Sequence, residues 1–88
     1  MWDTVYRALS DPQRRAILQR LRQGSLTASD IGAPLAIGAS TLSHHLKLLR
    51  EAELVRCEKR GTQRVYSLNT SVLEDLATEI LRFRGTGD

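Results

Sequence analysis

The sequence contains little cysteine and no long hydrophobic run, and both absences narrow the class of protein. Its single cysteine, Cys57, cannot form a disulfide within the chain, and one cysteine suits a reducing compartment. No hydrophobic run approaches the roughly 20 residues of a membrane-spanning helix, and the N-terminus lacks the hydrophobic core of a signal peptide. We therefore expect a soluble, cytoplasmic chain in which Cys57 packs within a strand.

The residue patterns of catalytic sites are absent as well. The sequence shows no arrangement of serine, histidine and aspartate, or of cysteine and histidine, that suggests nucleophilic catalysis, and no glycine-rich loop that would bind a phosphate. We therefore expect neither an enzyme nor a bound cofactor. The 88 residues suffice for one small domain over residues 1–88, and so short a chain has little core, which favours oligomerisation.

The charge that is present is unevenly distributed. The net charge is +3, but residues 40–64 hold six basic and three acidic side chains, whereas residues 65–88 hold two basic and four acidic ones. A basic segment beside an acidic one indicates a polyanionic partner for one face of the molecule. A solvated surface of mixed charge is the simpler alternative, and charge alone does not decide between the two.

Hydrophobic spacing and turn residues predict a mainly helical domain with one small β-hairpin. Asp11 before Pro12 is typical of a helix start, Gly24 of a helix end and Gly61 of a hairpin turn. The predicted elements are a helix over 1–9, a helix from Pro12 to near Gly24, a short helix from Thr27 to near Pro34, a helix from Ala39 or Ser40 to about Ala52, strands over 54–59 and 64–68, and a helix that starts at a cap formed by 69–71 and reaches about 84.

Residues 27–52 have the outline of a helix-turn-helix motif. Thr27 with Asp30 resembles a capping box, and Gly38 marks a tight turn between two short helices. In such a motif the second helix enters the major groove of DNA. The predicted hairpin over 54–68 follows it directly and forms a wing.

The helix over 39–52 has a hydrophobic face and a polar face. At about 100° per residue, Leu42, Leu46 and Leu49 share one side, and His45 lies at its margin as a packed, hydrogen-bonded residue. Small hydroxyls on the other side let a helix enter a groove deeply, and an ammonium group contacts phosphate or guanine. The candidate DNA-contacting residues are Ser40, Thr41, Ser43, His44, Lys47 and Arg50 on this helix, and Lys59, Arg60, Gln63 and Arg64 on the wing. The alternative is a protein-interaction module whose exposed helix docks on a partner protein.

The terminal helices carry more hydrophobic residues than one small domain can bury. We interpret the helices over 1–9 and 70–84 as a two-fold dimer interface, and the alternative is a last helix that packs across the core of a monomer. The candidate dimer residues are Trp2, Val5, Leu9, Val72, Leu76, Ile80 and Phe83. Arg14 and Arg15 follow Asp11 by three and four residues on the predicted helix, and we interpret them as structural ion-pair partners rather than phosphate contacts.

Three segments together resemble the ArsR/SmtB family of winged-helix repressors, in the family's order and across nearly the whole chain. They are Ser10-Asp11-Pro12-Gln13-Arg14-Arg15-Ala16-Ile17-Leu18, Ser40-Thr41-Leu42-Ser43-His44-His45-Leu46-Lys47-Leu48-Leu49-Arg50-Glu51-Ala52 and Val65-Tyr66-Ser67-Leu68-Asn69. The resemblance implies a winged helix-turn-helix fold and a homodimeric bacterial transcription factor, usually a repressor, that binds an imperfect palindrome in double-stranded DNA. It also implies that Ser40, Ser43, His44 and Lys47 contact bases and phosphates.

The sequence departs from the metal-sensing members of that family. Those members often carry a Cys-x-Cys pair on the third helix, where this chain has Thr27-Ala28-Ser29. A second family site uses aspartate and histidine on the last helix, but residues 70–84 contain no histidine. His44 and His45 point about 100° apart on a helix, which is too divergent to chelate one ion. We therefore expect no metal site, and the resemblance is to the metal-independent branch, some of whose members act through a protein partner.

Overall fold

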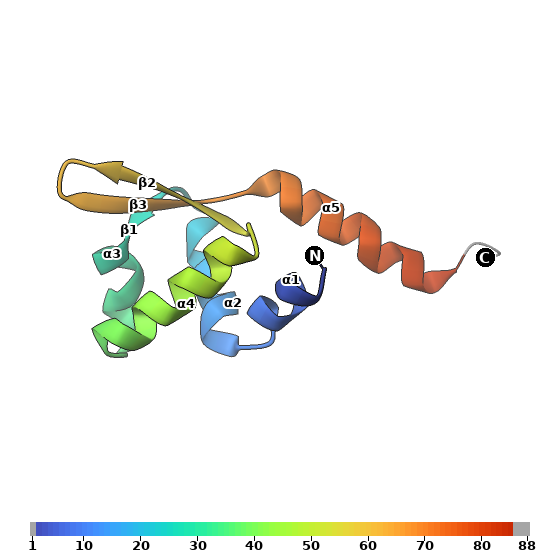
Figure 1. Ribbon diagram of the computed structural model, residues 1–88, viewed down its shortest axis with the longest axis horizontal. Coiled ribbons are helices and arrows are strands. Elements are labelled where there is room, and N and C mark those ends of the chain that lie inside the picture. The colour runs from blue at the N-terminus through green and yellow to red at the C-terminus, as the bar shows by residue number, and fades with distance from the viewer. Residues whose placement is uncertain (1, 86–88) are drawn as a thin grey trace.

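The computed structural model describes residues 2–85, and its elements follow the predicted order (Figure 1). Met1 and residues 86–88 of the predicted domain lie outside the described residues. The α-helices are α1 (Trp2–Leu9), α2 (Pro12–Leu21), α3 (Ala28–Gly32), α4 (Ala39–Glu51) and α5 (Thr70–Leu81). The strands are β1 (Leu26–Thr27), β2 (Val55–Arg60) and β3 (Gln63–Leu68), and the 3₁₀ turns are η1 (Ala33–Leu35) and η2 (Arg82–Arg84). The mainly helical fold with a hairpin wing is thus confirmed.

The sheet contains one strand that the sequence did not predict. The order of its strands is β1-β3-β2, all antiparallel, and Leu26 and Thr27 of β1 pair with Tyr66 and Val65 of β3. A strand of two residues is too short to show the alternation by which strands are recognised in a sequence. Its pairing with β3 ties the start of the helix-turn-helix to the base of the wing.

The ends of the helices depend on side chains that the sequence identified correctly in two places. The Asp11 carboxylate accepts hydrogen bonds from the backbone N–H groups of Gln13, at 2.7 Å, and Arg14, at 3.2 Å, at the start of α2. The Thr27 hydroxyl accepts from the N–H of Asp30 at 3.2 Å at the start of α3. Such caps satisfy N–H groups that have no partner within their own helix.

Two arginines at the start of α2 differ from their predicted role as ion-pair partners of Asp11. Arg14 donates from Nε to the carbonyl oxygen of Ala8 at 2.7 Å and from Nη2 to that of Arg7 at 3.0 Å. Arg15 donates to the carbonyl oxygen of Leu9 at 2.7 Å. Both arginines therefore cap the C-terminal end of α1, where carbonyl groups lack partners within the helix and the helix dipole is negative.

The turn between α3 and α4 is built differently from the prediction. Gly38 has an extended conformation, with φ −69° and ψ 161°, and serves as the N-cap residue of α4. The left-handed residue of the connection is Ala36, with φ 53° and ψ 42°. We predicted a tight turn at Gly38, but Gly38 has negative φ, and the left-handed conformation that glycine tolerates best occurs instead at Ala36, the C-cap residue of η1.

The ends of the wing show one confirmed prediction and one correction. Gly61 has φ +60° and is the first of two residues that connect β2 to β3, the position that favours glycine in a type II′ hairpin turn. Asn69 occupies the N-cap position of α5, but its side-chain amide donates to the carbonyl oxygen of Glu53 at 3.0 Å. Asn69 therefore ties α5 to the segment that follows α4, rather than capping α5 with its side chain.

The core lies where α1, α2, α3, α4, the first half of α5 and the sheet meet. Its most deeply buried side chains are Val5, Ile17, Ile31, Leu49 and Leu54. The molecule is 52 Å long and 23 by 22 Å across, with the wing at one end and α5 extending beyond the helices at the other (Figure 1). This shape puts the two candidate binding regions at opposite ends. Within residues 2–85, no helix is long and hydrophobic enough to cross a membrane.

Candidate nucleic-acid interface

Helix α4 is held by one face and leaves its polar face in solvent. Leu46 and Leu49 are buried, and His45, predicted at the margin, is also buried with 5% of its surface exposed. The predicted contact residues Ser40, Thr41, Ser43, His44, Lys47 and Arg50 are all exposed. The predicted division of this helix into a packed and an open face is therefore confirmed.

Helix α3 packs closely against the first half of α4. A Cβ atom at Gly32 would lie 2.6 Å from Leu42 Cδ2, so the backbone of α3 approaches α4 as closely as a glycine allows. Leu42 is partly buried there against the core. This contact sets the position of the N-terminal half of α4, which carries most of the exposed hydroxyl groups.

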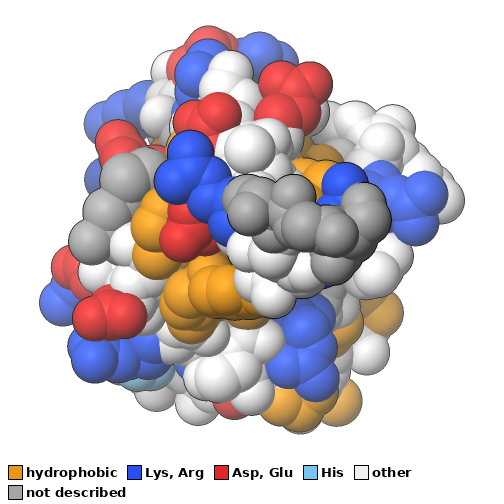
Figure 2. Space-filling view, turned by 90° about the vertical axis from the view of Figure 1, so that its right-hand side faces the viewer, with side chains coloured by type: hydrophobic (Ala, Val, Ile, Leu, Met, Phe, Trp, Pro, Cys, Tyr) orange, Lys and Arg blue, Asp and Glu red, His pale blue; other side chains and the backbone are white. Residues whose placement is uncertain are grey.

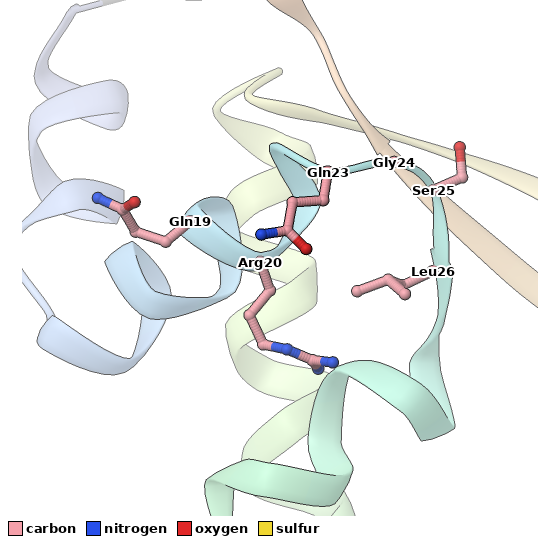
Figure 3. Close-up of a pocket in the computed structure, with 6 residues that line it drawn as sticks. All are labelled: Gln19, Arg20, Gln23, Gly24, Ser25 and Leu26. Atoms are coloured by element: carbon pink, nitrogen blue, oxygen red, sulfur yellow. The ribbon is translucent and has the colours of Figure 1, made fainter.

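An open hollow of about 450 Å³ lies between the end of α2 and the segment that leads into β1 (Figure 3). Arg20 reaches across it from α2 and donates to the carbonyl oxygens of Asp30 and Ile31 in α3, the latter at 3.1 Å. These bonds fasten α3 to α2. The hollow thus lies beside contacts that hold the helix-turn-helix in place.

A groove of about 340 Å³ runs between α4 and β3, and we call it the basic groove. Its lining residues are Ala28, Leu42, Ser43, Leu46, Lys47, Arg50, Arg64 and Tyr66. Burial, and then its hydrogen bond with the Cys57 side chain, raise the pKa of Tyr66 above its ordinary value. A neutral phenol beside Cys57 therefore forms part of the groove, while its cationic groups come from α4 and β3.

The wing divides the four residues predicted for it between two faces. Lys59 pairs with Arg64 and Arg60 with Gln63 across the hairpin, and neighbouring pairs project to opposite sides of a sheet. Lys59 and Arg64 share the face of Cys57 and Tyr66, which is the face of the basic groove. Arg60 and Gln63 lie on the other face, so the structure does not bring all four residues together.

The two faces of the wing also differ in how their charges are paired. Arg60 forms an ion pair with Glu58 at 2.5 Å, so part of its charge is already compensated. Lys59 and Arg64 lie directly opposite one another, and like charges at such cross-strand positions destabilise a sheet. An anion bound between them would relieve that repulsion. The sequence showed the basic residues but not their pairing, because the register decides which of them meet.

The terminal helices place the predicted dimer residues in two different environments. Val5, Val72 and Leu76 are buried within the protomer, at 1%, 8% and 7% exposure, and leave little surface for a second copy to cover. Trp2 and Leu9 are partly buried against the core. Ile80 and Phe83, together with Leu81, are exposed at 48%, 73% and 54%, and we call these three residues the apolar tip. Figure 2, viewed from this end, shows hydrophobic side chains at the surface among charged ones.

Potential metal ligands lie apart from one another in the described part of the chain. Between residues 2 and 85, no group of three or more histidine, cysteine, aspartate or glutamate side chains is placed to hold a metal ion. The rings of His44 and His45 are 6.4 Å apart between centroids and tilted by 43°.

A helix-turn-helix whose second helix exposes a polar face, followed by a basic hairpin, defines a winged helix-turn-helix domain of the DNA-binding type. Comparison with known proteins agrees with this class. The family model described as "Helix-turn-helix domain" matches residues 9–58.

Relatives of similar length place the chain more closely. The transcriptional repressor SdpR of Bacillus subtilis is 42% identical over 86 residues, which cover 98% of this chain and 96% of that protein. An arsenical resistance operon repressor of Staphylococcus xylosus is 41% identical over 71 residues, 81% of this chain and 68% of the repressor. A crystal structure of an ArsR family transcriptional regulator superposes with a TM-score of 0.79 at 27% identity, covering 97% of this chain and 98% of that one. The chain belongs to the ArsR family of winged helix-turn-helix transcriptional regulators.

Proposed function

We propose that this regulator binds a palindromic operator in double-stranded DNA as a homodimer and represses transcription. The observation that carries the proposal is the basic groove, where Lys47 and Arg50 of α4 face Arg64 of the wing. Cationic groups that line a groove beside an exposed polar helix suit a phosphate backbone that flanks a major groove. The proposal assigns a binding function and no catalytic one, and it places the regulator in the cytoplasm with its DNA.

The proposed contacts fall into two groups. Ser40, Thr41, Ser43 and His44 project from the N-terminal half of α4 and would contact base edges and nearby phosphates in the major groove. Lys47, Arg50, Arg64 and Lys59 would neutralise the phosphates of the adjacent backbone. Arg60 and Gln63 lie on the outer face of the wing, and we propose that they contact DNA only beyond the half-site.

The proposed dimer uses the ends of the chain. The apolar tip exposes hydrophobic surface that water solvates poorly, and a second copy of the chain would cover it. Two copies related by a two-fold axis would place their α4 helices about 34 Å, or one turn of DNA, apart. The operator would then consist of two inverted half-sites.

Selection of bound duplexes from a random DNA library tests the DNA-binding proposal directly. We expect a palindromic consensus, and anisotropy titrations of that duplex should show an affinity that falls steeply as salt rises. Lys47→Ala should lower the slope of log affinity against log salt by about one, as expected for one lost phosphate contact. Arg22→Ala is the matched control, because Arg22 is the exposed C-cap residue of α2, bonds to Gln19 and does not line the basic groove. Equal binding of all duplexes by both variants and the wild type would overturn the proposal.

We further propose that operator binding needs no metal ion. The proposal is supported by Thr27, Ala28 and Ser29 at the place of the family's cysteine pair, since hydroxyl and methyl groups are poor ligands for soft metals. Treatment of the protein with EDTA, and titration with Zn²⁺ afterwards, should leave the affinity for the selected duplex within about twofold of its starting value. A loss of binding on adding Zn²⁺ that EDTA reverses would contradict this.

A further inference from the structure

A buried polar network connects α1 and α2 to the packed face of α4. Arg14 is 8% exposed and His45 is 5% exposed, and they are the charged and polar residues that the structure describes as buried. Arg14 Nη1 lies 3.1 Å from His45 Nδ1, and His45 Nε2 lies 2.8 Å from the side-chain oxygen of Gln13. The same guanidinium group donates to the last carbonyl groups of α1.

The donors and acceptors in this network fix the chemical state of His45. A guanidinium group has only N–H donors, so Nδ1 of His45 must accept the hydrogen bond from Arg14. Nε2 then carries the hydrogen and donates it to the Gln13 oxygen. The network therefore holds His45 as the neutral imidazole with hydrogen on Nε2, and each of its bonds has one direction.

Directional bonds supply what the rest of this interface lacks. Leu46 and Leu49 hold α4 by hydrophobic contact, which has no preferred direction. His45 lies on α4 between Ser43 and Lys47, so a rotation of α4 that moved those residues in the groove of DNA would break its bonds. Buried polar networks are one means by which proteins select a single arrangement of packed elements.

We propose that Arg14 and His45 are positioning residues. They fix the orientation of α4 relative to α1, and thereby the angle at which α4 discriminates DNA sequences. Arg14 is the central residue of this network, because its one guanidinium group both caps α1 and bonds to His45. The proposal rests on the proposed function for its biological meaning. Its structural part, the coupling of α1 to α4, stands without DNA.

A matched pair of arginine variants separates positioning from simple stability. Arg14→Met removes the bonds to α1 and to His45, whereas Arg15→Met removes only a capping bond to α1, at Leu9, of the same 2.7 Å length. Both variants should lower Tm. At a temperature where circular dichroism shows both to be folded, Arg14→Met should reduce the ratio of affinities for the selected and a scrambled duplex by about tenfold, the loss expected for misplaced base contacts. Arg15→Met should leave that ratio within about twofold.

Two substitutions of His45 test which bond matters. His45→Asn keeps an acceptor near the position of Nδ1, so Arg14 stays satisfied, while His45→Gln keeps a donor near Nε2 and leaves Arg14 without its acceptor. We expect the asparagine variant to discriminate like the wild type within about threefold and the glutamine variant to resemble Arg14→Met. Equal discrimination by all four variants, whether intact or lost, would overturn the proposal.

Amide hydrogen exchange gives a readout that does not depend on DNA. Arg14→Met should speed exchange both at the end of α1 and along α4, whereas Arg15→Met should speed it in α1 alone. Should the wild type select no duplex, the proposed function fails but this coupling is still measured. Exchange in α4 that is the same in both variants would refute the coupling even if DNA binding is confirmed.

Discussion

At one end of the molecule α4 and the wing expose hydroxyl, imidazole, ammonium and guanidinium groups, whereas at the other end the apolar tip exposes Ile80, Leu81 and Phe83. Water solvates the first surface well, so polar exposure there adds no cost to the free protomer. The second surface is solvated poorly and gains free energy when it is covered. The comparison indicates two kinds of partner: a charged polymer at the basic end and a protein surface at the apolar end.

The network around Arg14 lies between these two ends. It joins α1, whose Val5 and Ala8 belong to the same core as Val72 and Leu76 of α5, to α4, which lines the basic groove. Hydrophobic packing holds the two ends together, and the network adds bonds of fixed direction between α1 and α4. We therefore propose that this network connects the DNA-contacting end of the molecule to the end that associates with a second copy.

The largest expected effect comes from the apolar tip. Ile80→Lys places a charge in the apolar tip. In sedimentation at micromolar concentration it should convert the proposed dimer to the 9.9 kDa monomer. Loss of the second half-site contact should weaken operator affinity about 100-fold, because two linked reading helices bind more tightly than one. Ser71→Lys, exposed in the first turn of α5 and nine residues before Ile80, is the control and should remain dimeric.

Leu76, another residue predicted for the dimer interface, does not suit this test. Leu76 is 7% exposed within the protomer, so a charge at Leu76 would unfold the domain and not report on the dimer alone. A wild type that sediments as a monomer would contradict the proposal that the apolar tip binds a second copy of the chain.

The second effect concerns the shape of the basic end. Gly61→Ala forces an alanine into φ +60° and should lower the free energy of unfolding by about 1–2 kcal/mol, the cost of a left-handed residue with a side chain. Gly38→Ala is the control, since Gly38 has φ −69° and open space around it, and its change should stay below about 0.5 kcal/mol. Urea denaturation measures both, and equal losses would show that the wing turn does not need positive φ.

The third effect separates charge from structure on the wing. Arg64→Gln should weaken operator binding roughly fivefold and lower the salt slope by about one. Because Arg64 faces Lys59, the same change should raise stability without DNA by a few tenths of a kcal/mol. Arg56→Gln, on the other face of the hairpin and near Asn69, should change neither the slope nor the affinity beyond experimental error.

The smallest expected effect is on the pH dependence of stability, through Asp11 at the start of α2. Desolvation acts to raise the pKa of Asp11, but the N–H groups of Gln13 and Arg14 hold it below its ordinary value of 3.8. A lowered pKa in the folded state means that Asp11 adds stability above about pH 4 and loses that contribution as the pH falls further. Asp11→Asn keeps the cap but does not titrate, so its melting temperature should fall less than that of the wild type between about pH 4 and pH 2.5. Equal falls in melting temperature for the wild type and Asp11→Asn would show that the charge of Asp11 contributes nothing to stability.

Much of the fold could be read from local signals. Asp11-Pro12, Thr27 and Gly61 each act on backbone groups within a few residues, so their effect is visible in the sequence. The polar face of α4 was equally visible, because helical periodicity alone assigns Ser40, Ser43 and Lys47 to one side. Two details differed from the prediction: Ala36, the C-cap residue of η1, took the left-handed conformation in place of Gly38, and the Asn69 side chain bonded to Glu53, 16 positions away, rather than to its own helix.

The sequence by itself determined the helices, the wing, the basic reading face and the hydrophobic excess of α5, since each depends on residue type and spacing along one segment. Only the tertiary structure decided that Arg14 meets His45, 31 positions away in the chain, and that Arg64 rather than Arg60 lines the groove of α4. It also moved Val72 and Leu76 into the core and left Ile80 and Phe83 outside. These outcomes depend on which surfaces come together, and no pattern along a single segment contains that information.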